Sequence, residues 1–158
     1  MDLDALLIDL ESRTDIEAEA FARQLYAEIF LTKRQFGVHP THDEQEVVFH
    51  AGRFNHAFFT DPSHGRFSFA KTLLARHRIE RMRWILPVIL GAVPRSACWQ
   101  TTGESGRAMR LYLLHDHNYV VWLTERSDGN GFNFSSAYVA GVRDIREYTR
   151  GGRRLAAF

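Results

Sequence analysis

The hydrophobic periodicity of this chain changes at Pro94, and that change limits the folds available to it. In residues 71–93, apolar side chains recur at spacings of three and four, which is typical of an amphipathic helix. In residues 95–138, short runs of alternating, β-branched and aromatic residues are separated by turn-forming residues. A helix followed by strands joined through tight turns predicts an α+β fold with an antiparallel sheet.

Residues 71–93 are expected to form one long central helix that packs on the sheet. His77, Arg81 and Trp84 lie four and three positions apart, so they would share a face beside the apolar stripe. Pro87 falls inside the helix and should kink it after Trp84. The apolar stripe itself consists of Ile79, Met82, Leu86, Ile89 and Val93.

The expected sheet is a meander of about four antiparallel strands, because each apolar run ends at a group of turn formers such as 127–131. The run 119–124 is the strongest strand signal in the sequence. The four expected strands are residues 95–101, 108–115, 119–124 and 132–138.

The remaining segments complete one domain over residues 1–158. Thr14 and Asp15 offer a cap for a helix over residues 16–33, so we expect residues 1–45 to be an N-terminal helical extension. Within it, residues 36–44 read as a loop. Residues 46–49 are a short strand candidate that begins a core over residues 46–140. Residues 141–158 form a basic tail, which is expected to end in a loose segment.

Composition excludes several classes of protein. With 45% hydrophobic and 25% charged residues the chain is globular rather than disordered, and its twelve Phe predict an aromatic-rich core. A single cysteine, Cys98, excludes an internal disulfide and fits a reducing, cytoplasmic environment. No apolar run reaches the length of a membrane span. The net charge of +1 does not mark a nucleic-acid binder, although five arginines between Arg76 and Arg95 predict a local basic patch.

Eight histidines do not amount to a metal site. The close pairs, His39 with His42 and His115 with His117, lie in expected turns, and no third ligand joins them. We therefore expect neither a metal nor a cofactor.

Three short elements occur in a definite order along the chain. They are a histidine before an aromatic pair (His56-Ala-Phe-Phe59), a helical Arg81-Met-Arg-Trp-Ile85, and a strand ending Phe134-Ser-Ser-Ala-Tyr138. Taken singly, each has an ordinary structural explanation: a packed histidine, an arginine lying along a tryptophan, and a polar strand end with a buried tyrosine.

Taken together, these elements resemble a phage-associated nuclease family grouped with barnase, EndoU, the tRNA-cutting colicins and RelE. The resemblance covers residues 48–139. Met82 stands where that family usually has isoleucine, and Pro87 interrupts the helix. The resemblance implies a helix packed on a small antiparallel sheet.

The activity that the resemblance implies is metal-independent cleavage of RNA by attack of the ribose 2′-OH on the adjacent phosphate, and tRNA, rRNA and mRNA all stay open as the target. It implies a general acid or base at His56, since an unperturbed imidazole titrates near ~6.5. Arg81 would hold the phosphate, and Ser136 and Tyr138 would donate hydrogen bonds, with Tyr138 able to stack on a base. The candidate substrate-binding residues are His77, Arg78, Trp84 and Arg110.

A toxin of this type implies a cognate inhibitor or immunity protein as a partner, and action in the cytoplasm, including that of a target bacterial cell. Two other interpretations remain open from the residues alone. The first is a non-catalytic RNA- or protein-binding module in which Arg81 and Tyr138 grip a backbone. The second is a small-molecule-binding domain in which His56 is structural.

Overall fold

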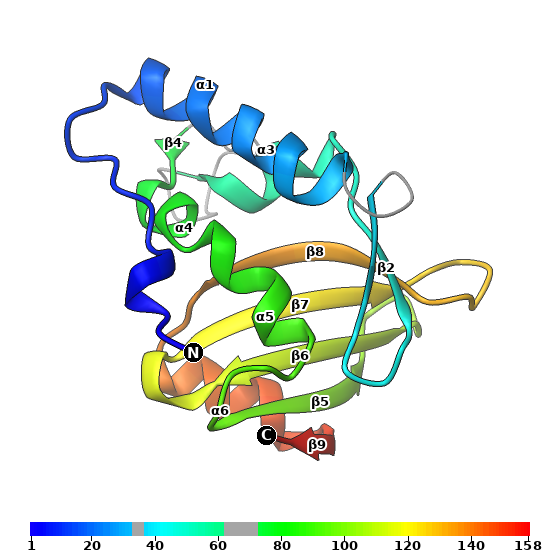
Figure 1. Cartoon of the computed structure of the whole chain (residues 1–158). Coiled ribbons are helices and arrows are strands. Elements are labelled where there is room, and N and C mark those ends of the chain that lie inside the picture. The colour runs from blue at the N-terminus through cyan, green and yellow to red at the C-terminus, as the bar shows by residue number, and fades with distance from the viewer. Residues whose placement is uncertain (33–36, 62–72) are drawn as a thin grey trace.

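Seven strands form one curled sheet that resembles half a barrel (Figure 1). The computed structural model describes residues 1–32, 37–61 and 73–158. The strand order is β1-β2-β8-β7-β6-β5-β9, and a separate two-stranded sheet pairs β3 (Phe59–Thr60) with β4 (Leu73–Leu74). The strands of the large sheet are β1 (Val38–Pro40), β2 (Glu46–Val48), β5 (Ser96–Thr102), β6 (Ala108–Leu114), β7 (Tyr119–Glu125), β8 (Phe132–Val139) and β9 (Arg153–Ala157).

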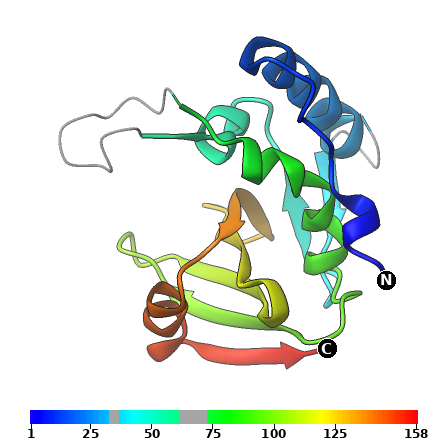
Figure 2. The same cartoon turned by 90° about the vertical axis from the view of Figure 1, so that its left-hand side faces the viewer.

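Helices cover the two faces of this sheet unequally (Figures 1 and 2). The inner, concave face carries α3 (Arg53–Phe58), α4 (Arg76–Glu80) and α5 (Ile85–Ile89). α1 (Asp15–Tyr26) lies beyond α3 and packs on it through Tyr26, whose ring contacts Phe54 and Phe58. The outer face carries α6 (Val142–Arg150), whose Ile145 and Tyr148 pack beside buried sheet residues such as Leu113 and Val120. The short helical turns are η1 (Asp4–Leu6), η2 (Ala27–Leu31), η3 (Met82–Trp84) and η4 (His115–His117).

The main core lies between the inner face and the helices, and it is aromatic-rich as expected. Phe30, Phe49 and Phe134 stack on one another, with ring centroids of Phe30 and Phe49 4.5 Å apart and those of Phe49 and Phe134 4.9 Å apart. This stack ties the N-terminal helical region, the segment after β2, and β8 into one hydrophobic unit. Cys98 is buried in the same core.

Several sequence predictions are confirmed. Thr14 caps α1, and its hydroxyl accepts a hydrogen bond from the Glu17 N–H at 3.2 Å. The strand expected over 46–49 is β2, and the four strands expected over 95–138 are β5, β6, β7 and β8, which pair consecutively and antiparallel.

The prediction of one long central helix is wrong. In the described part of 71–93, residues 73–74 form β4, and the helical residues are divided among α4, η3 and α5. Arg81 leaves helical geometry at φ −101° and ψ 10°, which ends α4. The chain then restarts a helix at Ile85, so Pro87 falls in a first turn, where its missing N–H has no helical acceptor to lose.

The prediction of a roughly four-stranded antiparallel sheet is also wrong. The meander is extended to a mixed sheet of seven strands, because β2 runs parallel to β8 and β9 pairs with β5. The expected loop over 36–44 contains β1, and the basic tail forms α6 and then β9 where a loose end was expected. β1 is only three residues long, and β9 pairs with β5, which is distant in sequence, so local periodicity does not reveal either strand.

One edge of β8 is only partly paired among the described residues. β2 pairs with β8 at Phe132 and Asn133, and α3 and α4 lie along the remainder of β8. A β-bulge interrupts the pairing of β8 with β7 on its other edge: Leu123 lies opposite Phe134 and Trp122 opposite Ser136, so Ser135 is the extra residue.

Candidate functional site

Arg53 of α3 reaches the bulge in β8. Its Nε donates to the Ser135 carbonyl at 3.1 Å, and its Nη2 donates to Ser135 Oγ at 2.9 Å. Phe54 and Phe58 bury the opposite side of this short helix in the core, which fixes the position of Arg53. The bulge residue is therefore held by a guanidinium rather than by a neighbouring strand.

Arg78 of α4 lies farther along the same edge. Its Nη1 donates to the Ala57 carbonyl at 3.1 Å, and its guanidinium carbon is 4.9 Å from the centroid of the Tyr138 ring, within cation–π range. The Nε of Arg78 is buried and has no hydrogen-bond partner among the described residues.

A cleft of about 230 Å³ opens beside the bulge, lined in part by Thr124 of β7 and Phe134. His50 also lines it, with Nε2 3.1 Å from Asn133 Oδ1. We refer to the group of polar residues along this edge as the β8-edge site; it consists of His50, Arg53, Arg78, Asn133, Ser135 and Tyr138.

No carboxylate in the described part of the chain neutralises the two arginines of the β8-edge site. Within residues 1–32, 37–61 and 73–158, neither Arg53 nor Arg78 lies at ion-pair distance from an acidic group. Burial lowers the pKa of both side chains, with Tyr26 opposing the shift at Arg53 and Tyr138 opposing it at Arg78. A guanidinium stays protonated despite such a shift, so this edge of the sheet attracts anions.

Tyr138 and Ser136 lie on the outer face of the sheet, where Ser136 faces Trp122 across the β7–β8 pair. The Tyr138 hydroxyl accepts a hydrogen bond from Trp122 Nε1 at 3.2 Å and lies 3.0 Å from the Tyr148 hydroxyl of α6. The ring of Tyr138 is thus fixed at the edge, in contact with Arg78 on one side and α6 on the other.

His56 is exposed on α3, one helical turn after Arg53. Its chain neighbour Ala57 provides the carbonyl that accepts from Arg78. The structure therefore brings the backbone at His56 close to Arg78, and Arg78 close to Tyr138.

Arg81 and His77 lie at the end of α4, and Arg81 is engaged with its own helix. Its Nη1 donates to the His77 carbonyl at 2.8 Å, and Glu80 Oε2 lies 3.7 Å away. His77 lies at an exposed position. Its imidazole is nevertheless partly desolvated, and this effect, together with the smaller effects of the Arg78 and Arg81 charges, lowers its pKa. Arg78, rather than Arg81, is the arginine in contact with Tyr138.

Trp84 is a core residue. Its side chain is 1% exposed, and its Nε1 donates to the Leu3 carbonyl at 2.9 Å. In this conformation the indole anchors the N-terminal segment and has no surface to offer a substrate.

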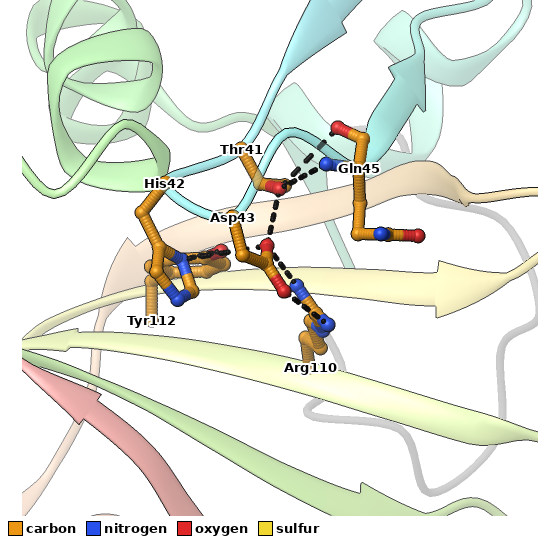
Figure 3. A network of polar contacts seen from close by, with 6 residues as sticks. All are labelled: Thr41, His42, Asp43, Gln45, Arg110 and Tyr112. Carbon is orange, nitrogen blue, oxygen red and sulfur yellow. Dashed lines mark hydrogen bonds and ion pairs between the residues drawn. The ribbon is translucent and has the colours of Figure 1, made fainter.

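Arg110 belongs to a different cluster, shown in Figure 3. It makes a bidentate ion pair with Asp43, at 2.7 Å and 2.8 Å, in the hairpin between β1 and β2. Thr41 donates to the same carboxylate at 2.6 Å, and His42 Nδ1 lies 2.8 Å from the Tyr112 hydroxyl. This cluster fastens the β1–β2 hairpin to β6, and both terminal nitrogens of Arg110 are used in it.

In the described part of the chain, no three His, Cys, Asp or Glu side chains gather in a way that could hold a metal ion. Nor does any helix in those ranges have the length and apolarity needed to cross a membrane.

No family model, curated protein or solved structure matches this chain.

Sequence reasoning missed four members of the β8-edge site: His50, Arg53, Asn133 and Ser135. Two signals were available, since Arg53 lies one turn before His56 and Ser135 is the neighbour of Ser136. Nothing in the local pattern of Phe134-Ser-Ser-Ala-Tyr138 marks the first serine as the bulge, so the choice between the two serines required the pairing with β7.

Proposed function

We propose that the protein is a metal-independent endoribonuclease whose substrate phosphate binds at the β8-edge site. The observation that carries this proposal is the pair of arginines, Arg53 and Arg78, which stand along one strand edge without a carboxylate partner in the described residues. Planar guanidinium groups are suited to binding phosphate oxygens.

The reaction proposed is attack of a ribose 2′-oxygen on the adjacent phosphorus, with cleavage of the bond from phosphorus to the 5′-oxygen. A base removes the 2′-OH proton and an acid protonates the departing 5′-oxygen. His56 is the first candidate for one of these roles, and His50, which precedes α3, is the candidate for the second. Arg53 and Arg78 would stabilise the extra negative charge on the phosphate.

Tyr138 fits a positioning role better than proton transfer, because its hydroxyl is already engaged by Trp122 and Tyr148. Its ring could stack on a base next to the phosphate. Because the Tyr138 hydroxyl is engaged and its ring is held in place, the structure also favours a second candidate function, a non-catalytic RNA-binding module on the same surface. Ser136 and Arg81 remain candidates for substrate contact outside the β8-edge site. On either proposal the substrate is RNA in a cytoplasm, and a cognate inhibitor would act by covering this edge.

The test is incubation of purified protein with total RNA in EDTA, read on a gel. Wild type should cut, and His56→Ala and Arg78→Ala should each reduce the rate by about 10²–10³-fold. Arg83→Ala, an exposed arginine on η3, is the matched control and should cut normally. If wild type binds RNA without cutting it, the result supports the non-catalytic binding module. If His56→Ala cuts RNA as wild type does, His56 has no catalytic role.

A further inference from the structure

α6 presents an arginine face to solvent. Arg143, Arg146 and Arg150 are spaced by three and four residues, so they lie on one side of the helix, and all three are exposed. The opposite side, with Ile145 and Tyr148, packs on the outer face of the sheet. We call these three residues the α6 arginine face.

The α6 arginine face is part of the most basic stretch of the chain. Residues 142–158 contain five arginines and two acids, whereas the whole chain has a net charge of only +1. Among the described residues, none of these five arginines lies at ion-pair distance from a carboxylate. Positive charge collected in this way attracts an extended polyanion more than a single small anion.

The sheet surface beside α6 offers aromatic rings. Trp99 and Trp122 point to the outer face and are only partly buried, and Arg154 lies opposite Trp99 in the β5–β9 pair. The Trp122 ring packs edge-on against Tyr148 at 5.1 Å between centroids. Rings held rigidly beside arginines are the combination that single-stranded nucleic acids use for stacking and phosphate contact.

This surface is continuous with the β8-edge site. Next to Trp122 and Ser136 on the outer face lie Thr124 and Asn133, which face each other across β7 and β8. Both residues line the cleft that contains Arg53. At the other end of β8, Tyr138 contacts both α6, through Tyr148, and Arg78.

From this arrangement we infer that the α6 arginine face, with Trp99 and Trp122, is a second RNA-binding surface. It holds the single strand that leads into or out of the β8-edge site, and it acts through phosphate charge and base stacking without sequence readout. The inference rests on the proposed function for its substrate class, but it concerns binding and not cleavage. A membrane surface is a poorer fit, because the apolar side of α6 is used up against the sheet.

The test uses a fluorescent 20-nucleotide 2′-O-methyl oligoribonucleotide, which lacks the 2′-OH and cannot be cut. Fluorescence anisotropy would compare wild type, Arg146→Gln/Arg150→Gln and the charge-matched control Arg83→Gln/Arg95→Gln, all exposed positions. The α6 variant should bind at least about tenfold more weakly at low salt. Its log–log salt slope should be smaller by about 1.4, the value for two lost phosphate contacts on a single strand. The control should bind within about twofold of wild type.

Equal affinity of wild type and the α6 variant would overturn the inference, as would equal losses in both variants. A third result would also overturn it: the α6 variant no longer sediments with phosphatidylserine vesicles, as wild type does, but still binds the oligoribonucleotide equally well. That result would assign the α6 arginine face to a membrane. The inference and the proposed function can fail separately. If the α6 variant loses binding and wild type does not cut total RNA, the α6 arginine face is supported as an RNA-binding surface and the nuclease proposal is contradicted.

Discussion

At the scale of single residues, the arginines of this protein divide by the groups that they face. Arg110 faces a carboxylate and has a structural role, whereas Arg53 and Arg78 face backbone, a hydroxyl and a ring. Residue type and spacing in the sequence do not show which arginine pairs with a carboxylate and which does not. The sequence predicted Arg78 and Arg110 alike as substrate-binding, and the difference depends on Asp43, which lies in a hairpin far from Arg110 in the chain.

The Arg110–Asp43 pair predicts an asymmetric effect of its two deletions. The Arg110 side chain is 9% exposed and that of Asp43 is 37% exposed. Asp43→Ala would leave a buried charge unpaired and should lower the free energy of unfolding by about 3 kcal/mol. Arg110→Met would leave a carboxylate that water can reach, so the loss should be nearer about 1 kcal/mol. Urea denaturation measures both; equal losses would contradict this assignment of burial.

The same pair predicts a pH dependence of stability. Burial raises the pKa of Asp43, but hydrogen bonds from Arg110 and Thr41 outweigh that effect and lower it to about 2. An unfolded aspartate titrates near ~3.9, so the contribution is complete above that pH and is lost as the pH falls toward 2. The stability difference between wild type and Asp43→Ala should therefore shrink between about pH 4 and pH 2. Unfolding measured by urea at several pH values checks this, and a constant difference would contradict it.

At the scale of the elements, the sequence predicts what is local and misses what is not. The Thr14 cap and the strands β5 to β8 follow from residues adjacent in the chain. The break of the central helix at Arg81 has no glycine or proline to mark it, and Pro87, which does stand out, is accommodated in a new first turn. The pairing of β2 with β8 brings together segments with no shared pattern in the sequence.

That pairing predicts a strong requirement for glycine at position 131. Gly131 has φ +92°, and a Cβ there would lie 2.4 Å from the Glu46 carbonyl oxygen at the start of β2. Gly131→Ala should push β2 away from β8 and cost at least about 2 kcal/mol, from backbone strain and lost packing together. Thermal or urea unfolding measures the loss.

Gly129 provides the control, since it also has a positive φ (+73°), but a Cβ added there would meet no described atom within 4 Å. Gly129→Ala should cost only the backbone term of about 1 kcal/mol. If the two variants were equally stable, the contact with Glu46 would have no energetic weight.

At the scale of the whole molecule, one strand from the C-terminal region completes the far side of the sheet. β9 covers the edge of β5, and Leu155 packs against the main core. Phe158, which follows β9, contacts His42 of the β1–β2 hairpin with ring centroids 5.0 Å apart. The two ends of the curled sheet are therefore linked through a residue from each, which periodicity in either segment could not indicate.

Leu155→Glu should release β9 from this position. A carboxylate placed against the core should lower the free energy of unfolding by about 2–3 kcal/mol, and an uncovered β5 edge should promote association between molecules. Unfolding curves and light scattering at increasing concentration would show both effects. Arg153→Glu, at an exposed position of the same strand, should change stability by less than about 0.5 kcal/mol. Similar behaviour of the two variants would mean that Leu155 does not anchor β9.

The parallel pairing of β2 with β8 also sets the time at which the chain can finish folding. The meander strands are consecutive in the chain and can pair as each is synthesised. β2 cannot pair until β8 has been made, because Val47 lies opposite Phe132, and this pairing closes a long loop. During synthesis, Phe30 and Phe49 lack Phe134, their stacking partner. The β8-edge site draws on residues from His50 to Tyr138, so a growing chain does not contain it until β8 has left the ribosome. If the protein cuts RNA, the ribosome that synthesises it is therefore not exposed to a complete site until β8 has been made.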